Sequence, residues 1–170
     1  MDMNLLDGED WLEQAWPPEK AGFRWQRKRI AGEHVGASLY ELEPGQSTFP
    51  YHYELGNDEL LVVVTGCPTL RSPDGERELR PGDCLLFPSG PGGAQQITNR
   101  SSELTMVLLV SNFAMPRAAV QVDSNKMMIR WGLVQRSASG SALTMRPTTG
   151  MVKPSGSCPS GSCLRPETMH

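Results

Sequence analysis

The feature that most constrains the fold is a series of short apolar or alternating segments between about residues 35 and 131. Turn-forming residues bound each segment at close intervals, a pattern that is typical of an all-β sandwich or barrel. The segments are too short for the helices of a bundle, whereas strands are commonly about four to eight residues long. We expect strands at residues 37–42, 59–64, 69–72, 76–79, 84–87, 94–98, 104–111, 119–122 and 126–131.

Glycine and proline pairs separate these segments. Pro44-Gly45, Gly56-Asn57 and Pro81-Gly82 supply the positive or preset φ angles that a chain reversal needs. Asp74-Gly75 lies between two apolar segments and predicts a β-hairpin. The turn residues therefore support the same all-β fold as the strand pattern.

The two ends of the chain lack this pattern. Residues 1–34 show no clear period and are expected to form an irregular N-terminal arm, in which residues 7–12 could start a short helix that Pro17-Pro18 would end. Residues 132–170 are rich in Ser, Gly, Thr and Pro and are expected to form a disordered, low-complexity tail. We therefore expect one domain, a β-barrel at residues 35–131, between an arm and a flexible tail.

Charge and composition exclude several classes of partner. Sixteen Lys and Arg against 19 Asp and Glu give a net charge of −3, which argues against nucleic acid as a partner. The longest apolar runs, residues 60–64 and 106–110, are far shorter than the ~20 residues of a membrane span. The N-terminus is acidic, unlike a secretory signal, so a cytoplasmic protein is expected. Cys67 and Cys84 are expected to be small buried residues.

The basic run at residues 24–29 allows two interpretations. It could contact an anionic partner, or it could form a solvated face or a charge-protected edge strand, and the second interpretation is favoured. Tyr51 and Tyr53, if they point outward, could contribute to a homodimer surface or occupy ordinary half-exposed strand positions.

Four polar residues are candidates for one interior site. His52 and Glu54 are two residues apart and share a strand face, while Glu59 and Gln95 lie on strands that could approach the same point. An imidazole, two carboxylates and an amide oxygen suit a divalent metal such as manganese, iron, nickel, zinc or magnesium. Two carboxylates in a barrel interior would otherwise need a proton or a basic partner.

Two blocks of the sequence resemble the paired motifs of the cupin superfamily, over roughly residues 35–115. The chain is most similar to small bacterial single-domain cupins of the cupin 2 conserved barrel type, which implies a cupin double-stranded β-helix, or jelly-roll barrel. In cupins that bind metal, the positions of His52, Glu54, Glu59 and Gln95 form the ligand set. Glu54 and Gln95 stand where the family has its second and third histidines. The matching positions are Gly45, His52, Glu59 and Gly66 in the first block and Gly82, Pro88, Gly90 and Asn99 in the second.

Three classes of function follow from these features. The favoured hypothesis is a binding protein whose barrel holds a small polar ligand, with or without a divalent metal, because two family imidazoles are missing. The alternative is a metal-dependent enzyme of the oxygenase or isomerase type that uses His52, Glu54, Glu59 and Gln95. A third class, an interaction module that only dimerises, has little support in the sequence.

Overall fold

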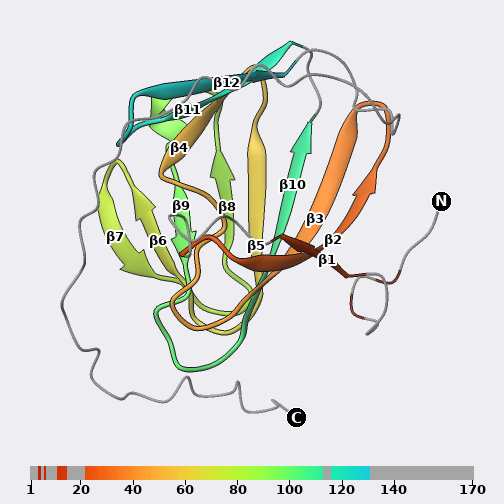
Figure 1. Cartoon of the computed structure of the whole chain (residues 1–170), viewed down its shortest axis with the longest axis vertical. Helices are drawn as coiled ribbons and strands as arrows, with labels where there is room; N and C mark the ends of the chain where they lie inside the picture. The colour runs from red at the N-terminus through yellow and green to blue at the C-terminus, as the bar shows by residue number, and fades with distance from the viewer. Residues whose placement is uncertain (1–3, 5, 7–10, 15–21, 113–115, 131–170) are drawn as a thin grey trace.

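The fold is built from antiparallel strands arranged in three sheets (Figure 1). The computed structural model describes residues 4, 6, 11–14, 22–112 and 116–130, which form 12 strands and the short 3₁₀ helix η2 (Pro91–Gly93). The all-β fold expected from the strand and turn pattern is thus confirmed, as is the jelly-roll barrel that the family resemblance implies. Within these described ranges, no helix has the length and apolar character needed to cross a membrane.

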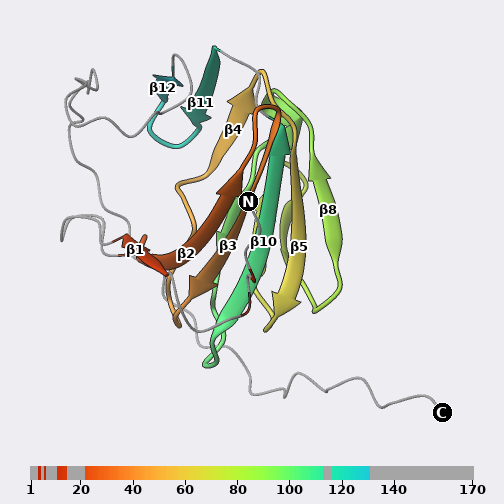
Figure 2. The same ribbon diagram turned by 90° about the vertical axis from the view of Figure 1, so that its right-hand side faces the viewer.

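The largest sheet has six strands in the order β1-β2-β3-β10-β5-β8. Each neighbouring pair is antiparallel. Figure 2 shows β2, β3, β10 and β5 standing side by side, with β8 beyond β5. The strands are β1 (Leu12–Gln14), β2 (Trp25–Ala31), β3 (Val35–Leu42), β10 (Thr105–Asn112), β5 (Glu59–Thr65) and β8 (Cys84–Phe87).

Two sheets of three strands complete the barrel, in the orders β12-β11-β4 and β7-β6-β9. In Figure 2, β11 and β12 lie on the side of β4 that faces away from β8. An isolated bridge between His52 and Gln95 connects the start of β4 to the chain just before β9. The strands are β4 (His52–Leu55), β6 (Thr69–Ser72), β7 (Gly75–Glu78), β9 (Gln96–Thr98), β11 (Arg117–Gln121) and β12 (Lys126–Arg130).

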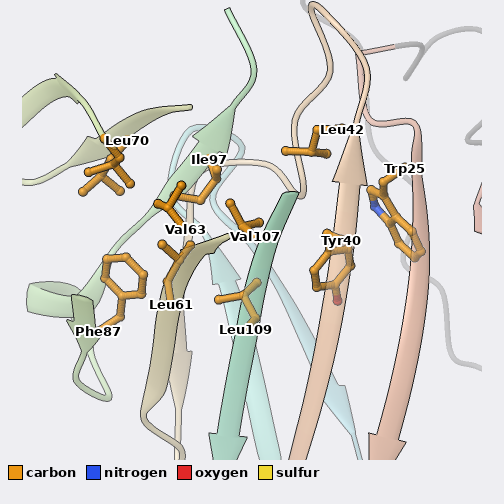
Figure 3. Packing of buried hydrophobic residues seen from close by; sticks show 11 residues of the cluster. Trp25, Tyr40, Leu42, Leu61, Val63, Leu70, Phe87, Ile97, Val107 and Leu109 are labelled. Atoms are coloured by element: carbon orange, nitrogen blue, oxygen red, sulfur yellow. The ribbon is translucent and has the colours of Figure 1, made fainter. Parts of the chain in front are cut away.

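The hydrophobic core lies on one face of the six-stranded sheet (Figure 3). Alternate residues of β5 and β10 point into it, including Leu61, Val63 and Val107, each at most 1% exposed. Side chains two apart on a strand share a face, which explains why these positions are buried together. Burying one such side chain contributes about 1.5–3 kcal/mol, so this packing fixes the register of the sheet.

The N-terminal segment contributes strands β1 and β2, where only an edge strand at the basic run was among the expectations. Strand β2 pairs with β3 over six positions, and Trp25 is only 5% exposed, with its indole Nε1 donating to the Thr48 carbonyl oxygen at 2.9 Å. Leu12–Gln14 is a strand paired with β2, so the expected helix is wrong for these residues. The edge of β3 provides backbone hydrogen-bond partners for β2. Local sequence preference does not reveal such long-range pairing.

Most barrel strands lie where the turn residues predict them. The hairpin at Asp74-Gly75 joins β6 to β7, and Gly75 has the positive φ of 110° that the turn requires. Two side-chain expectations are wrong: Cys84 is exposed, and Tyr51 is only 8% exposed, with the Arg71 guanidinium 4.0 Å from its ring centroid. The tail predicted at residues 132–170 lies outside the described residues.

Candidate ligand-binding site

A cavity of about 340 Å³ lies between the six-stranded sheet and the β12-β11-β4 sheet. Strands from both sheets line it with every second residue, as the pleat of a strand dictates. His52, Glu54 and Glu59 all line this cavity. The other lining residues are Trp25, Arg27, Arg29, Gly36, Ser38, Tyr40, Phe49, Pro50, Leu109, Ser111, Arg117, Ala119, Gln121 and Met128.

His52 is held at the start of β4 by its backbone and by its ring. Its backbone N–H donates to the Gln95 carbonyl oxygen at 3.2 Å, and the Gln95 N–H donates back to the His52 carbonyl oxygen at 2.8 Å. The ring Nδ1 lies 2.8 Å from the Pro50 carbonyl oxygen, and the ring meets Phe49 edge-on at a centroid distance of 5.7 Å. These contacts fix the imidazole in the cavity wall.

The protonation state of His52 follows from these contacts. Burial lowers the pKa of His52 below 6.5; hydrogen bonding to the Pro50 carbonyl and the negative charge of Glu54 only partly offset this effect. A carbonyl oxygen can only accept, so Nδ1 carries the proton of the neutral ring and Nε2 is left as an acceptor. Nε2 lies 3.9 Å from Oε1 of Glu54. At neutral pH the site therefore presents an uncharged base beside a carboxylate.

Gln95 reaches the site through Glu59. Its side chain is only 1% exposed, and its Nε2 donates to Oε2 of Glu59 at 3.0 Å. The Gln95 Oε1 atom is buried and has no hydrogen-bond partner among the described residues. The amide therefore orients the Glu59 carboxylate from behind the cavity wall, and Gln95 itself is not among the lining residues.

The family of the barrel follows from sequence and structural comparison. Residues 38–112 match the family model described as Cupin domain. Residues 38–112 form a cupin domain. The motif resemblance at residues 45–66 and 82–99 lies within this match, as do all four candidate site residues of the cupin barrel. No curated protein sequence matches the chain.

Solved cupin structures share the fold of this cupin. A sugar phosphate isomerase of the cupin superfamily from Silicibacter pomeroyi is 26% identical, with a TM-score of 0.66 over 74% of this chain and 85% of that chain. A proposed sugar phosphate isomerase from Acidithiobacillus ferrooxidans is 23% identical, with a TM-score of 0.61 over 65% of this chain and 73% of that chain. A cupin 2 conserved barrel domain protein from Rhodopseudomonas palustris is 14% identical, with a TM-score of 0.55 over 64% of this chain and 74% of that chain.

The arrangement of donors in this cupin does not fit a preformed metal centre. Within the part of the chain that the structure describes, no three His, Cys, Asp or Glu side chains are close enough together to hold a metal ion. The Gln95 amide presents its N–H group to Glu59, whereas a shared metal would need the amide oxygen. Metal binding by His52, Glu54, Glu59 and Gln95 therefore stays a prediction.

Three arginines line the cupin cavity, which the favoured interpretation of the basic run at residues 24–29 did not predict. Arg27 and Arg29 of β2 and Arg117 of β11 all line it, and Lys28, on the opposite face of β2, is only 1% exposed. The favoured interpretation of the basic run was a solvated face or a charge-protected edge strand. The run does lie in a strand, β2, but this strand lies between β1 and β3, and a solvated face is wrong for Arg27 and Lys28. Charged residues are usually exposed, so a strand whose inner face carries arginines is difficult to recognise from sequence. The alternation of Trp25, Arg27 and Arg29 does have the period of a strand.

Proposed function

We propose that this cupin barrel binds a small polar ligand in the cavity lined by His52, Glu54 and Glu59. The observation that carries the proposal is that hydrogen-bonding groups from strands of two sheets line one shared cavity. A volume of about 340 Å³ suits a small molecule, because ligand pockets typically measure roughly 300–1,000 Å³.

The chemistry of the wall favours a ligand with hydroxyl groups. The Nε2 atom of neutral His52 and the carboxylates of Glu54 and Glu59 are acceptors, while the hydroxyls of Ser38 and Ser111 can donate or accept. The similarity to the Silicibacter structure named as a sugar phosphate isomerase supports a phosphorylated sugar as the first ligand class to test.

Native mass spectrometry of the freshly purified protein tests this proposal. We expect a bound organic species in the wild type, and we expect it to be weakened or lost in His52→Ala. His34→Ala is the matched control, because the His34 side chain is 85% exposed. A wild-type protein that carries no organic species, and that no polar metabolite stabilises in thermal unfolding, would contradict the proposal.

A metal-dependent cupin enzyme of the oxygenase or isomerase type is the second candidate. Two groups favour it: the buried Gln95 Oε1 atom has no hydrogen-bond partner among the described residues, and the Nδ1–H···O contact of His52 leaves its Nε2 atom as an acceptor at the cavity. Elemental analysis of protein purified without chelator distinguishes the candidates. Near-stoichiometric manganese, iron, nickel or zinc that is lost in His52→Ala supports the enzyme, whereas no metal in either protein supports the binding protein.

A further inference from the structure

Strand β2 gives the cavity a row of cationic side chains. Arg27 and Arg29 are two residues apart and line the same cavity, to which β11 adds Arg117. Among the described lining residues these guanidinium groups outnumber the carboxylates of Glu54 and Glu59. An arginine stays protonated at any pH that a protein tolerates. The cavity of a chain with a net charge of −3 thus has an excess of positive charge, which attracts an anion.

Arg27 has the geometry of an anion anchor. Its guanidinium carbon lies 5.0 Å from the Trp25 ring centroid and 5.9 Å from that of Tyr40, so two aromatic faces position the group. The Nε atom of Arg27 is buried and has no hydrogen-bond partner among the described residues. The planar guanidinium fork fits the oxygens of a phosphate better than the ammonium group of a lysine does.

A series of aromatic ring contacts connects Arg27 to His52. Trp25 and Tyr40 contact Phe49 at ring-centroid distances of 6.0 and 5.7 Å, and Phe49 contacts His52 at 5.7 Å. An apolar strip between two polar ends suits a ligand with an anionic head and a carbon body, because aromatic rings provide large apolar contact areas. The order of the rings gives the ligand a direction in the cavity.

We propose that Arg27 binds the phosphate group of the ligand and thereby directs the rest of the molecule past Phe49 toward His52 and Glu59. This inference rests on the proposed function and adds the charge of the ligand, the residue that selects for it and the orientation in which it binds. Loss of one charge-assisted contact of this kind weakens binding by about 10- to 100-fold.

The anion site can be tested first with inorganic phosphate, whose binding to the full chain is followed by ³¹P NMR titration. Wild type is compared with Arg27→Gln and with the control Arg77→Gln, which removes an exposed arginine from strand β7. We expect phosphate to bind wild type and Arg77→Gln equally and Arg27→Gln at least 10-fold more weakly. Equal affinity in all three proteins, or no binding to wild type, overturns the anchor.

A ligand series then separates phosphate from other anions and tests the direction. Calorimetry compares glucose 6-phosphate, glucuronate and glucose, which differ only at carbon 6: a phosphate ester, a carboxylate and a hydroxymethyl group. We expect the affinity to fall in that order for wild type, and Arg27→Gln to remove the preference for the phosphate. Preference for glucuronate overturns the phosphate assignment.

Two further measurements keep the outcome decisive. Arg27→Lys keeps the charge but loses the planar fork, so we expect an intermediate phosphate affinity. This variant serves as the test if Arg27→Gln fails to fold. Wild-type affinity in Arg27→Lys overturns the role of the fork. If the sugars bind wild type and Arg27→Gln alike, the anchor is wrong but the polar-ligand function stands. If no phosphate binds and mass spectrometry finds no bound species, both fail.

Discussion

His52 shows how the environment of one residue determines the chemistry of the site. Its Nδ1–H donates to Pro50 and its backbone is paired with Gln95, so the ring cannot turn to exchange its nitrogens without breaking a 2.8 Å hydrogen bond. Burial adds a preference for the uncharged ring. Together these contacts assign the acceptor role to Nε2, which the sequence could not do.

The lowered pKa of His52 predicts a pH dependence of stability. Between the folded pKa and the ordinary value of 6.5, the unfolded chain binds a proton that the folded protein excludes. The stability that neutral, buried His52 contributes to the folded protein is therefore fully present above about pH 6.5. It is lost as the pH falls from 6.5 through the lower pKa of the folded state. We expect His52→Gln to lose less stability than wild type between about pH 7.5 and 5 in urea titrations.

The control for this pH effect is His34→Gln, because the His34 side chain is 85% exposed and lies outside the cavity. It should follow the wild-type curve. The Glu54 carboxylate, 3.9 Å from the His52 Nε2, favours the protonated ring and reduces the effect. Parallel curves for wild type and His52→Gln would contradict a dominant role of burial.

Gln95 offers a test of the metal hypothesis at the level of one side chain. Its amide nitrogen already contacts Glu59 at 3.0 Å, so a histidine there would place a ring nitrogen near the carboxylate. Because imidazole is a stronger ligand than an amide, we predict that Gln95→His raises the affinity for Zn²⁺ or Ni²⁺ by at least about tenfold. Calorimetry measures this, with Gln96→His as the control because Gln96 contacts the Phe49 carbonyl instead. Unchanged affinity would remove Gln95 from any ligand set.

At the scale of elements, Gly66 sets how closely β5 can approach the start of β10. Its φ is 76°, and a Cβ atom there would collide with Oγ1 of Thr105 and come within 2.9 Å of the Thr105 Cα. We expect Gly66→Ala to lower the free energy of unfolding by more than about 2 kcal/mol, since strain from φ alone costs about 1–2 kcal/mol. Gly75→Ala, also at positive φ but with no atom near the added methyl, should cost less. Equal losses in urea denaturation would remove the close approach as the cause.

The elements also show what sequence alone can predict. Strands β6 and β8 begin and end at the predicted residues, because both have turn residues at their ends. A charge-protected edge strand was one expectation for residues 24–29, but β2 pairs on both sides, with β1 and β3. Its inner face carries Arg27 and Arg29, and a barrel interior is not where charges are expected. The short helix expected near Leu12 was wrong because pairing with β2 overrides local preference. Strand patterns do not indicate which positions of an inner face carry charged side chains.

At the scale of the whole molecule, the barrel depends on the segment that the sequence analysis treated as an arm. Strands β1 and β2 extend the six-stranded sheet, and Trp25 joins the core through contacts with Tyr40 and Phe49. Three of the cavity residues, including Arg27, come from β2. The site is therefore incomplete without residues that precede the matched cupin domain.

We predict that deleting residues 1–34 leaves an unstable, aggregation-prone barrel, because the deletion exposes the edge of β3 and removes Trp25. The smaller change Trp25→Ala should itself cost about 3–5 kcal/mol. Thermal unfolding and size-exclusion chromatography measure both effects, with deletion of residues 1–10 as the control that keeps both strands. A protein lacking residues 1–34 that unfolds at the wild-type temperature would show that the barrel is independent of β2.

The reciprocal hydrogen bonds between His52 and Gln95 involve only peptide groups, so they persist whatever side chains these positions carry. Mutations can then exchange ligands at this junction without disturbing the backbone that presents them. Glutamine and histidine codons differ by a single base, which places a more strongly metal-binding descendant one mutation away from this sequence. The backbone pairing at this junction is therefore compatible with side chains of different ligand chemistry, so these side chains can change during evolution while the fold is retained.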